Sequence, residues 1–101
     1  MKIQFERFNW NNNNYEPIIR HNFHVFNLYR ETIEWKMIHY LCNPKKGAAL
    51  SPFNPIQISW DKDAHSGIIT QYSYNHPELG PVEINKLRFR ILKSRTNKHW
   101  L

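Results

Sequence analysis

Residues 55–74, PIQISWDKDAHSGIITQYSY, carry the clearest indication of the fold. Ile56, Ile58 and Trp60 alternate with polar residues, which is the pattern of a strand with one buried face. The residues DKDAHSG then supply a turn, and GIITQYSY returns with the β-branched and aromatic composition that suits a pleated surface. The stretch therefore predicts an antiparallel hairpin with the three alternating apolar side chains turned inward.

A further strand pattern follows in residues 82–92, VEINKLRFRIL. Alternate residues of a strand point to opposite faces. One face of this strand is apolar and carries Leu87, Phe89 and Ile91. The other face is basic and carries Lys86, Arg88 and Arg90. The strand is therefore expected to hide its apolar face and to display its cations.

Positive charge is concentrated at the end of the chain. The chain has 14 Lys and Arg residues against 8 Asp and Glu, and its formal net charge is +6. Residues 86–101 form a basic strand and tail that contains no acidic residue. Its cations are Lys86, Arg88, Arg90, Lys93, Arg95 and Lys98. A row of cations along a strand can follow a phosphate backbone, although charges also protect edge strands from aggregation.

Length and composition indicate a single domain that spans residues 1–101. A chain of 101 residues, 41 % hydrophobic and 15 % aromatic, can bury one core. The alternating patterns predict a mainly β fold, a small antiparallel barrel or sandwich of five to six strands. The alternative is an α+β fold with one helix near residues 28–42 packed on the sheet.

The first half of the chain has weaker patterns. Residues 30–42, RETIEWKMIHYLC, match the strand and helix templates about equally, and their β-branched and aromatic content favours a strand. Residues 17–29, PIIRHNFHVFNLY, are consistent with a strand buried on both faces. The run NWNNNNY predicts a loop, because Asn bonds its neighbouring backbone and tolerates left-handed conformations. Residues 43–55, with two Asn-Pro steps, predict a long loop.

Targeting signals are not evident in the sequence. The N-terminal residues MKIQFERFNW lack the apolar run of a secretory signal, and no stretch approaches the roughly 18 apolar residues of a membrane helix. Cys42 is the only cysteine, so no internal disulfide can form. These features predict an intracellular, cytoplasmic protein without membrane contact.

Two short motifs resemble parts of metal sites. His21 and His24 would share a face on a helix, but their surroundings favour a strand. Residues 61–65, DKDAH, resemble the start of a calcium loop, but Ser66 and Tyr72 stand where such a loop needs Gly and Glu. We therefore expect a polar hairpin turn at this position, and neither a metal nor a cofactor.

Catalytic motifs are equally incomplete. Cys42 with a histidine could form a nucleophile and base, and histidine with Lys or Arg could cleave RNA as a toxin-like ribonuclease does. Neither pair has a signature motif, and Lys45, Lys46 and Gly47 lack the preceding glycines of a phosphate loop. We expect a protein without enzymatic activity, with the ribonuclease as a third possibility.

The basic strand and tail predict a protein that contacts nucleic acid. RNA or another single strand is favoured over duplex DNA, because no recognition helix is evident. The six cations would neutralise phosphates, while Trp10, Tyr15 and Trp100 would stack bases. The alternative is a small subunit or inhibitor that docks its arginines and aromatics on a larger acidic protein. The sequence resembles no family that we recognise.

Overall fold

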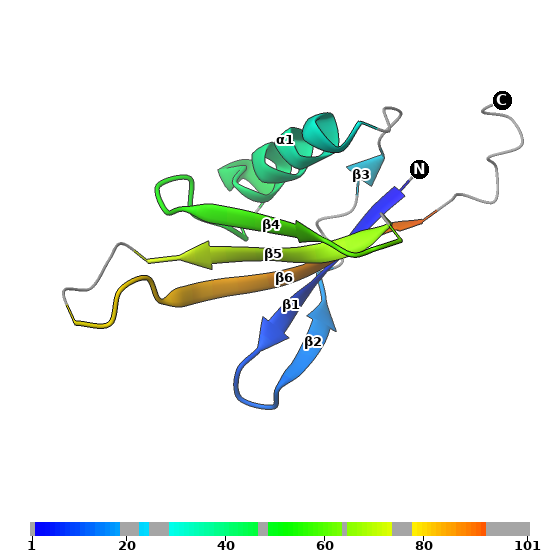
Figure 1. Cartoon of the computed structure of the whole chain (residues 1–101). Helices are drawn as coiled ribbons and strands as arrows, with labels where there is room; N and C mark the ends of the chain where they lie inside the picture. Colours follow the sequence, from blue (N-terminus) through cyan, green and yellow to red (C-terminus); the bar gives the residue numbers. More distant parts are fainter. Residues whose placement is uncertain are drawn as a thin grey trace, which may run out of the picture.

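The structure is a computed structural model that describes residues 2–18, 23–24, 29–46, 49–63, 65–73 and 78–92. The elements along the chain are β1 (Lys2–Asn9), β2 (Asn14–Pro17), β3 (Phe23–His24), α1 (Arg30–Leu41), a 3-10 helix (Pro44–Lys46), β4 (Ile56–Trp60), β5 (Ser66–Tyr72) and β6 (Glu83–Leu92). Within these residues the strands form an antiparallel sheet in the order β2-β1-β6-β5-β4, and β3 pairs with β1. Helix α1 lies over one face of the sheet (Figure 1).

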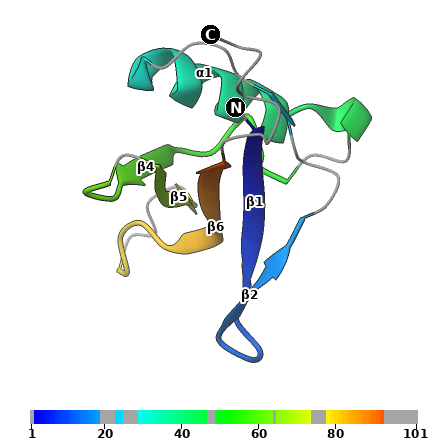
Figure 2. The same cartoon turned by 90° about the vertical axis from the view of Figure 1, so that its right-hand side faces the viewer.

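The predicted mainly β, antiparallel fold is confirmed. The sheet is open and not closed into a barrel, because its edge strands β2 and β4 do not pair with each other. The second layer is helix α1, as in the α+β alternative, and not a second sheet (Figures 1 and 2). The sheet twists strongly, so the β1–β2 turn points away from α1 in both views.

The predicted hairpin is confirmed. β4 and β5 pair antiparallel, with Trp60 opposite Gly67. The Trp60 indole packs edge-on against Phe89, with ring centres 4.9 Å apart. Its Nε1–H donates a hydrogen bond of 3.0 Å to Glu34 Oε2, and the guanidinium of Arg30 lies 5.2 Å from the ring centre. Trp60 is therefore turned inward and joins β4 to the N-terminal half of α1.

Residues 30–42, for which the composition favoured a strand, instead contain helix α1, so the strand prediction is wrong. Its buried side chains recur every four residues and form one stripe, Ile33, Met37 and Leu41. A strand would have placed Trp35 and His39 on the same face as this stripe, but both are exposed. The apolar sheet face has to be covered, and packing of a helical stripe on it overrides the β-rich composition of the segment.

The core lies between α1 and the sheet. The buried side chains come from β1, β5, β6 and α1 and from the segment after the 3-10 helix. They are Ile3, Phe5, Ile33, Met37, Leu41, Ala49, Leu50, Ile69, Leu87, Phe89 and Ile91. The predicted apolar face of β6 is therefore confirmed. Phe89 fits over Gly67, where a Cβ atom would come within 2.6 Å of its ring.

Two further segments, residues 43–55 and 17–29, are described only in part. Residues 43–55 form the predicted loop where they are described, with the 3-10 helix near its start. Buried Gln71 holds this loop, because its amide nitrogen donates to Ser51 C=O at 2.5 Å and its amide oxygen accepts from Ser51 N–H at 3.1 Å. The predicted strand over residues 17–29 lies largely outside the described residues. No helix in the described ranges has the length and hydropathy needed to cross a membrane.

Candidate nucleic-acid interface

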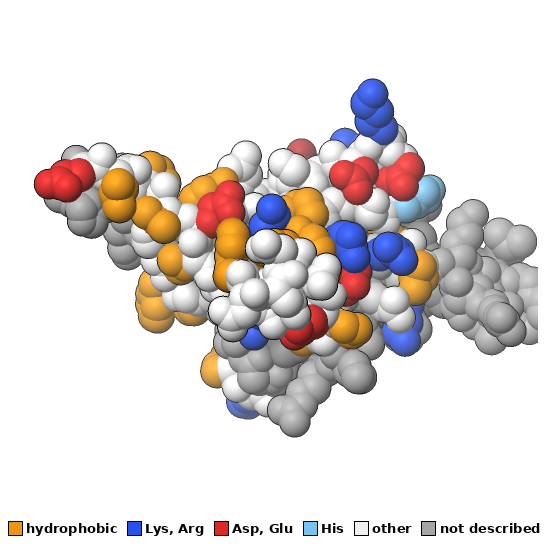
Figure 3. All heavy atoms as spheres, turned by 90° about the horizontal axis from the view of Figure 1, so that it is seen from below, with side chains coloured by type: hydrophobic (Ala, Val, Ile, Leu, Met, Phe, Trp, Pro, Cys, Tyr) orange, Lys and Arg blue, Asp and Glu red, His pale blue; other side chains and the backbone are white. Residues whose placement is uncertain are grey.

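The candidate site lies on the sheet face that α1 does not cover, which we call the open face. Figure 3 views the molecule from this side, and basic and hydrophobic side chains lie beside one another across it, with acidic side chains among them. The strand registers place on this face the side chains that concern binding: Glu6, Phe8, Tyr15, Lys86, Arg88 and Arg90. The predicted basic face of β6 is therefore turned away from the core.

Arg88 is the most constrained cation of the open face. Its Nε and Nη2 atoms both lie 2.9 Å from Glu6 Oε1, and Glu6 is its direct neighbour in the β1–β6 register. Its guanidinium carbon lies 4.4 Å from the centre of the Tyr15 ring. The side chains of Arg88 and Glu6 are 36 % and 28 % exposed. Arg88 is therefore partly neutralised by Glu6, and its guanidinium lies over the Tyr15 ring.

Lys86 and Arg90 flank Arg88 on the same strand. The Lys86 ammonium lies 5.3 Å from the centre of the Phe8 ring, and the side chain is half-buried. Arg90 is exposed. Neither makes an ion pair with an acid in the described part of the chain. These two side chains can therefore bind a phosphate without first breaking an ion pair with a carboxylate.

An aromatic cluster adjoins two of the three cations, Lys86 and Arg88. Phe8 packs edge-on against Trp10 and Tyr15, with ring centres 4.8 and 5.2 Å away. Trp10 is 53 % exposed, whereas Tyr15 is half-buried and carries the Arg88 guanidinium on one face. Trp10 is thus the ring with room for a stacked base, and Tyr15 supports Arg88.

The asparagine run builds the β1–β2 turn. The Asn9 side-chain oxygen accepts from Asn11 N–H at 2.9 Å, and that of Asn12 accepts from Asn14 N–H at 3.0 Å. Asn13 adopts a left-handed conformation with φ of 56°, which Asn tolerates better than most residues. The predicted loop is this tight hairpin turn, and it holds the exposed Trp10 indole at the tip of the hairpin.

The tail residues named by the sequence lie outside the described residues. They are Lys93, Arg95, Lys98 and Trp100. Their part in binding stays a prediction. The structure therefore brings together five of the predicted site residues, Trp10, Tyr15, Lys86, Arg88 and Arg90, and adds two that the prediction missed, Glu6 and Phe8. The alternation in KIQFERF could have indicated Phe8, since it places Phe8 and Glu6 on one face.

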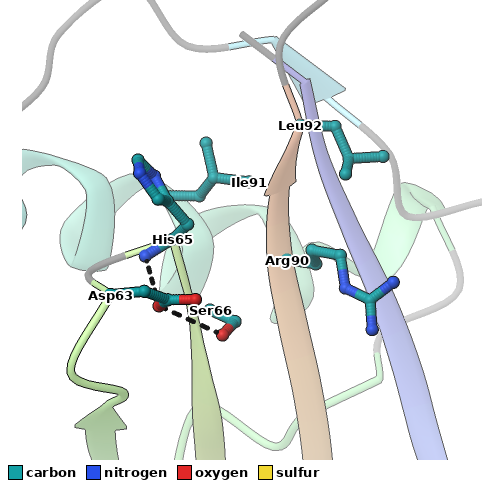
Figure 4. Close-up of a pocket in the computed structure, with 6 residues that line it drawn as sticks. All are labelled: Asp63, His65, Ser66, Arg90, Ile91 and Leu92. Carbon is teal, nitrogen blue, oxygen red and sulfur yellow. Dashed lines mark hydrogen bonds between the residues drawn. The ribbon is translucent and has the colours of Figure 1, made fainter.

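A shallow pocket of about 290 Å³ lies at the other end of β6 (Figure 4). Its lining residues are Asp63, His65, Ser66, Arg90, Ile91 and Leu92. Asp63 Oδ1 accepts from the backbone N–H of His65 at 2.9 Å, and Ser66 Oγ donates to Asp61 Oδ2 at 2.7 Å. The two carboxylates thus stabilise the predicted polar hairpin turn. The His65 ring and the Arg90 guanidinium point away from each other, so the pocket does not pair them for acid–base chemistry.

The sequence also contains candidate metal-binding, thiol and phosphate-loop residues. In the described residues, no group of three His, Cys, Asp or Glu side chains could hold a metal. His21 lies outside the described residues. Cys42 follows α1 and is half-buried, and burial raises the pKa of its thiol, which disfavours the reactive thiolate. Lys45 is exposed in the 3-10 helix, consistent with a solvated turn.

Comparison with protein-family models gives no match, and comparisons with curated proteins and with solved structures give none either.

Proposed function

We propose that this chain binds single-stranded nucleic acid, RNA in the first place, on its open face. One observation carries the proposal. Trp10, which is 53 % exposed, lies in an aromatic cluster directly beside Lys86 on a sheet face that α1 leaves uncovered. An aromatic ring beside cations on an open sheet is the arrangement with which proteins stack bases and neutralise phosphates.

The cations divide into two roles. Lys86 and Arg90 stand four residues apart on β6, which corresponds to about 13 Å along a strand, so they contact different phosphates. Arg88 lies between them and is already paired with Glu6. Because Glu6 and the Tyr15 ring already hold its guanidinium, Arg88 contributes less free charge than Lys86 and Arg90 do.

A single strand suits this surface better than a duplex. Stacking on Trp10 requires an unpaired base, because a base inside a duplex already has both faces covered. In sequence, the tail adds three cations and Trp100 immediately after β6. We include these residues in the proposed site on the strength of the sequence.

The salt dependence of RNA binding tests the proposal. Fluorescence anisotropy of a labelled single-stranded RNA gives the affinity at several salt concentrations. Log affinity is expected to fall linearly with log salt, by about 0.7 for each neutralised phosphate. The double variant Lys86→Ser/Arg90→Ser should flatten the slope by about 1.4, because it removes two phosphate contacts.

The matched control removes two cations elsewhere. Lys36 lies on α1 and Lys45 in the 3-10 helix, so both lie away from the open face. The double variant Lys36→Ser/Lys45→Ser should keep the wild-type slope. Absence of micromolar RNA binding at low salt, or equal slopes for both double variants, would reject the proposal and leave an acidic protein surface as the alternative partner.

A further inference from the structure

We propose that β4 is a dimerisation edge, on which a second copy of this chain pairs its own β4 antiparallel. β4 is an outermost strand of the sheet. It pairs with β5 on one side and with no described residue on the other. An open strand edge is a template for another strand.

The backbone hydrogen bonds of β4 show which groups point outward. Tyr72 N–H donates to Pro55 C=O at 3.0 Å, and Asp61 N–H donates to Ser66 C=O at 2.9 Å. In an antiparallel pair, residues that exchange hydrogen bonds alternate with residues that do not. The odd-numbered residues of β4 therefore bond to β5. Three residues direct their N–H and C=O groups to the free edge: Ile56, Ile58 and Trp60.

The opposite edge of the sheet, β2, is blunted. Ile18 N–H donates to Phe5 C=O at 2.9 Å, so Ile18 belongs to a hydrogen-bonded pair with β1. By the same alternation, the backbone groups of Tyr15 and Pro17 point to the free edge of β2. Pro17 has no N–H to offer, and prolines and charges are the usual protection of an edge. β4, with the sequence IQISW, has neither a proline nor a charge. The two edges therefore differ in their capacity to accept another strand.

The β4 strand is complementary to itself. A two-fold axis at Ile58 places this residue against its own copy and Ile56 against the partner's Trp60. Every outward N–H and C=O of the edge then has a partner. Gln57 comes opposite the partner's Ser59 on the open face, so no like charges meet. An acidic or basic peptide would find no complementary charge on this strand.

The apolar side of the edge also favours a second copy. Ile56, Ile58 and Trp60 are only partly buried at the margin of the core. A hollow of about 460 Å³ adjoins Ile56, between α1 and the strand, and is lined in part by Ile38 and Cys42. In the dimer, the partner's Trp60 lies across from Ile56 beside this hollow. Aromatic and β-branched side chains stabilise each other in such cross-strand positions.

Cysteine capture tests the register directly. Gln57 and the partner's Ser59 form a non-hydrogen-bonded pair, whose Cα atoms lie about 4.5 Å apart, a separation that a disulfide spans. In a Cys42→Ala background, the double variant Gln57→Cys/Ser59→Cys should form a covalent dimer on mild oxidation. Each single cysteine variant should stay monomeric on a denaturing gel, because position 57 faces position 59 and not itself.

Sedimentation velocity tests the dimer without cross-linking. Over about a hundredfold range of concentration, the 12.3 kDa chain should shift from monomer to dimer by mass action. The variant Gln57→Lys/Ser59→Lys places like charges opposite each other and should stay monomeric throughout. A control with the same added charge at the β2 end, Asn11→Lys/Asn14→Lys, should dimerise as the wild type does.

Three results would overturn the proposal. They are a wild-type chain that is monomeric at every concentration, a dimer that the Gln57→Lys/Ser59→Lys variant retains, and a single-cysteine variant that cross-links as fast as the double one. The proposal does not depend on nucleic-acid binding. RNA affinity measured at concentrations where the chain is monomeric separates the two.

Discussion

The two faces of β6 differ in burial and in the contacts that their side chains make. Leu87 and Phe89 are fully buried against α1 and the neighbouring strands. Lys86 and Arg90, one residue away, lie on the open face and have no ion-pair partner among the described residues. The comparison shows that one strand can supply the core and the candidate binding surface independently, since adjacent residues belong to different environments.

The largest expected effect is on the covered face. Phe89→Ala should lower the free energy of unfolding by about 3–5 kcal/mol, because a large ring leaves a cavity in the packed core. Guanidinium unfolding followed by circular dichroism measures this change. The neighbouring substitution Arg90→Ser should alter stability by less than about 0.5 kcal/mol. Equal losses for the two variants would show that the faces are not independent.

A smaller loss is expected where the covered face is tightest. A Cβ atom at Gly67 would meet the backbone oxygen of Ser59 and the ring of Phe89. Gly67→Ala should therefore cost about 1–3 kcal/mol through overpacking. The matched control is Ser59→Ala on the open face, which should be nearly neutral in the same unfolding experiment. A neutral Gly67→Ala would mean that the Phe89 ring has room to move.

On the open face, Trp10→Ala should weaken RNA binding by about 1–3 kcal/mol, the amount that one stacked base contributes. The stability of the fold should change little, because the indole is 53 % exposed. Trp35 on α1 is similarly exposed, at 61 %, but lies on the other side of the sheet. Trp35→Ala should leave the affinity measured by anisotropy unchanged, and a loss equal to that of Trp10→Ala would argue against stacking on the open face.

The smallest effect concerns the ion pair that limits Arg88. Glu6→Gln removes the carboxylate from Arg88 and frees the guanidinium to contact phosphate. The salt slope of RNA binding should then become steeper by up to about 0.7. The cost in stability should stay within about 1 kcal/mol, because the pair is partly exposed. Weaker RNA binding by this variant would show that Glu6 positions Arg88 and does not compete with the ligand.

Sequence reasoning succeeded where the signal is local. The alternation of residues in β4 and β6 predicted their faces, because a strand's period of two depends only on neighbouring residues. It failed for α1, because both periods fit the segment and the choice depends on the sheet that it covers. It also missed that Arg88 pairs with Glu6, which is 82 residues away in sequence and becomes its neighbour only in the sheet.

The place of β6 between β1 and β5 also constrains how the chain folds. β1 with β2, and β4 with β5, are each joined by short connections and can form as hairpins early. Neither hairpin contacts the other as a sheet neighbour until β6 pairs with both. Glu6 and Arg88, which are neighbours in the β1–β6 register, lie 82 residues apart in sequence. Pairing of β6 with β1 is therefore slow, since a long loop must close before the contacts form. During synthesis, the edges of β1 and β5 that β6 will occupy therefore remain unpaired until residue 92 has left the ribosome, and unpaired strand edges expose a folding chain to aggregation.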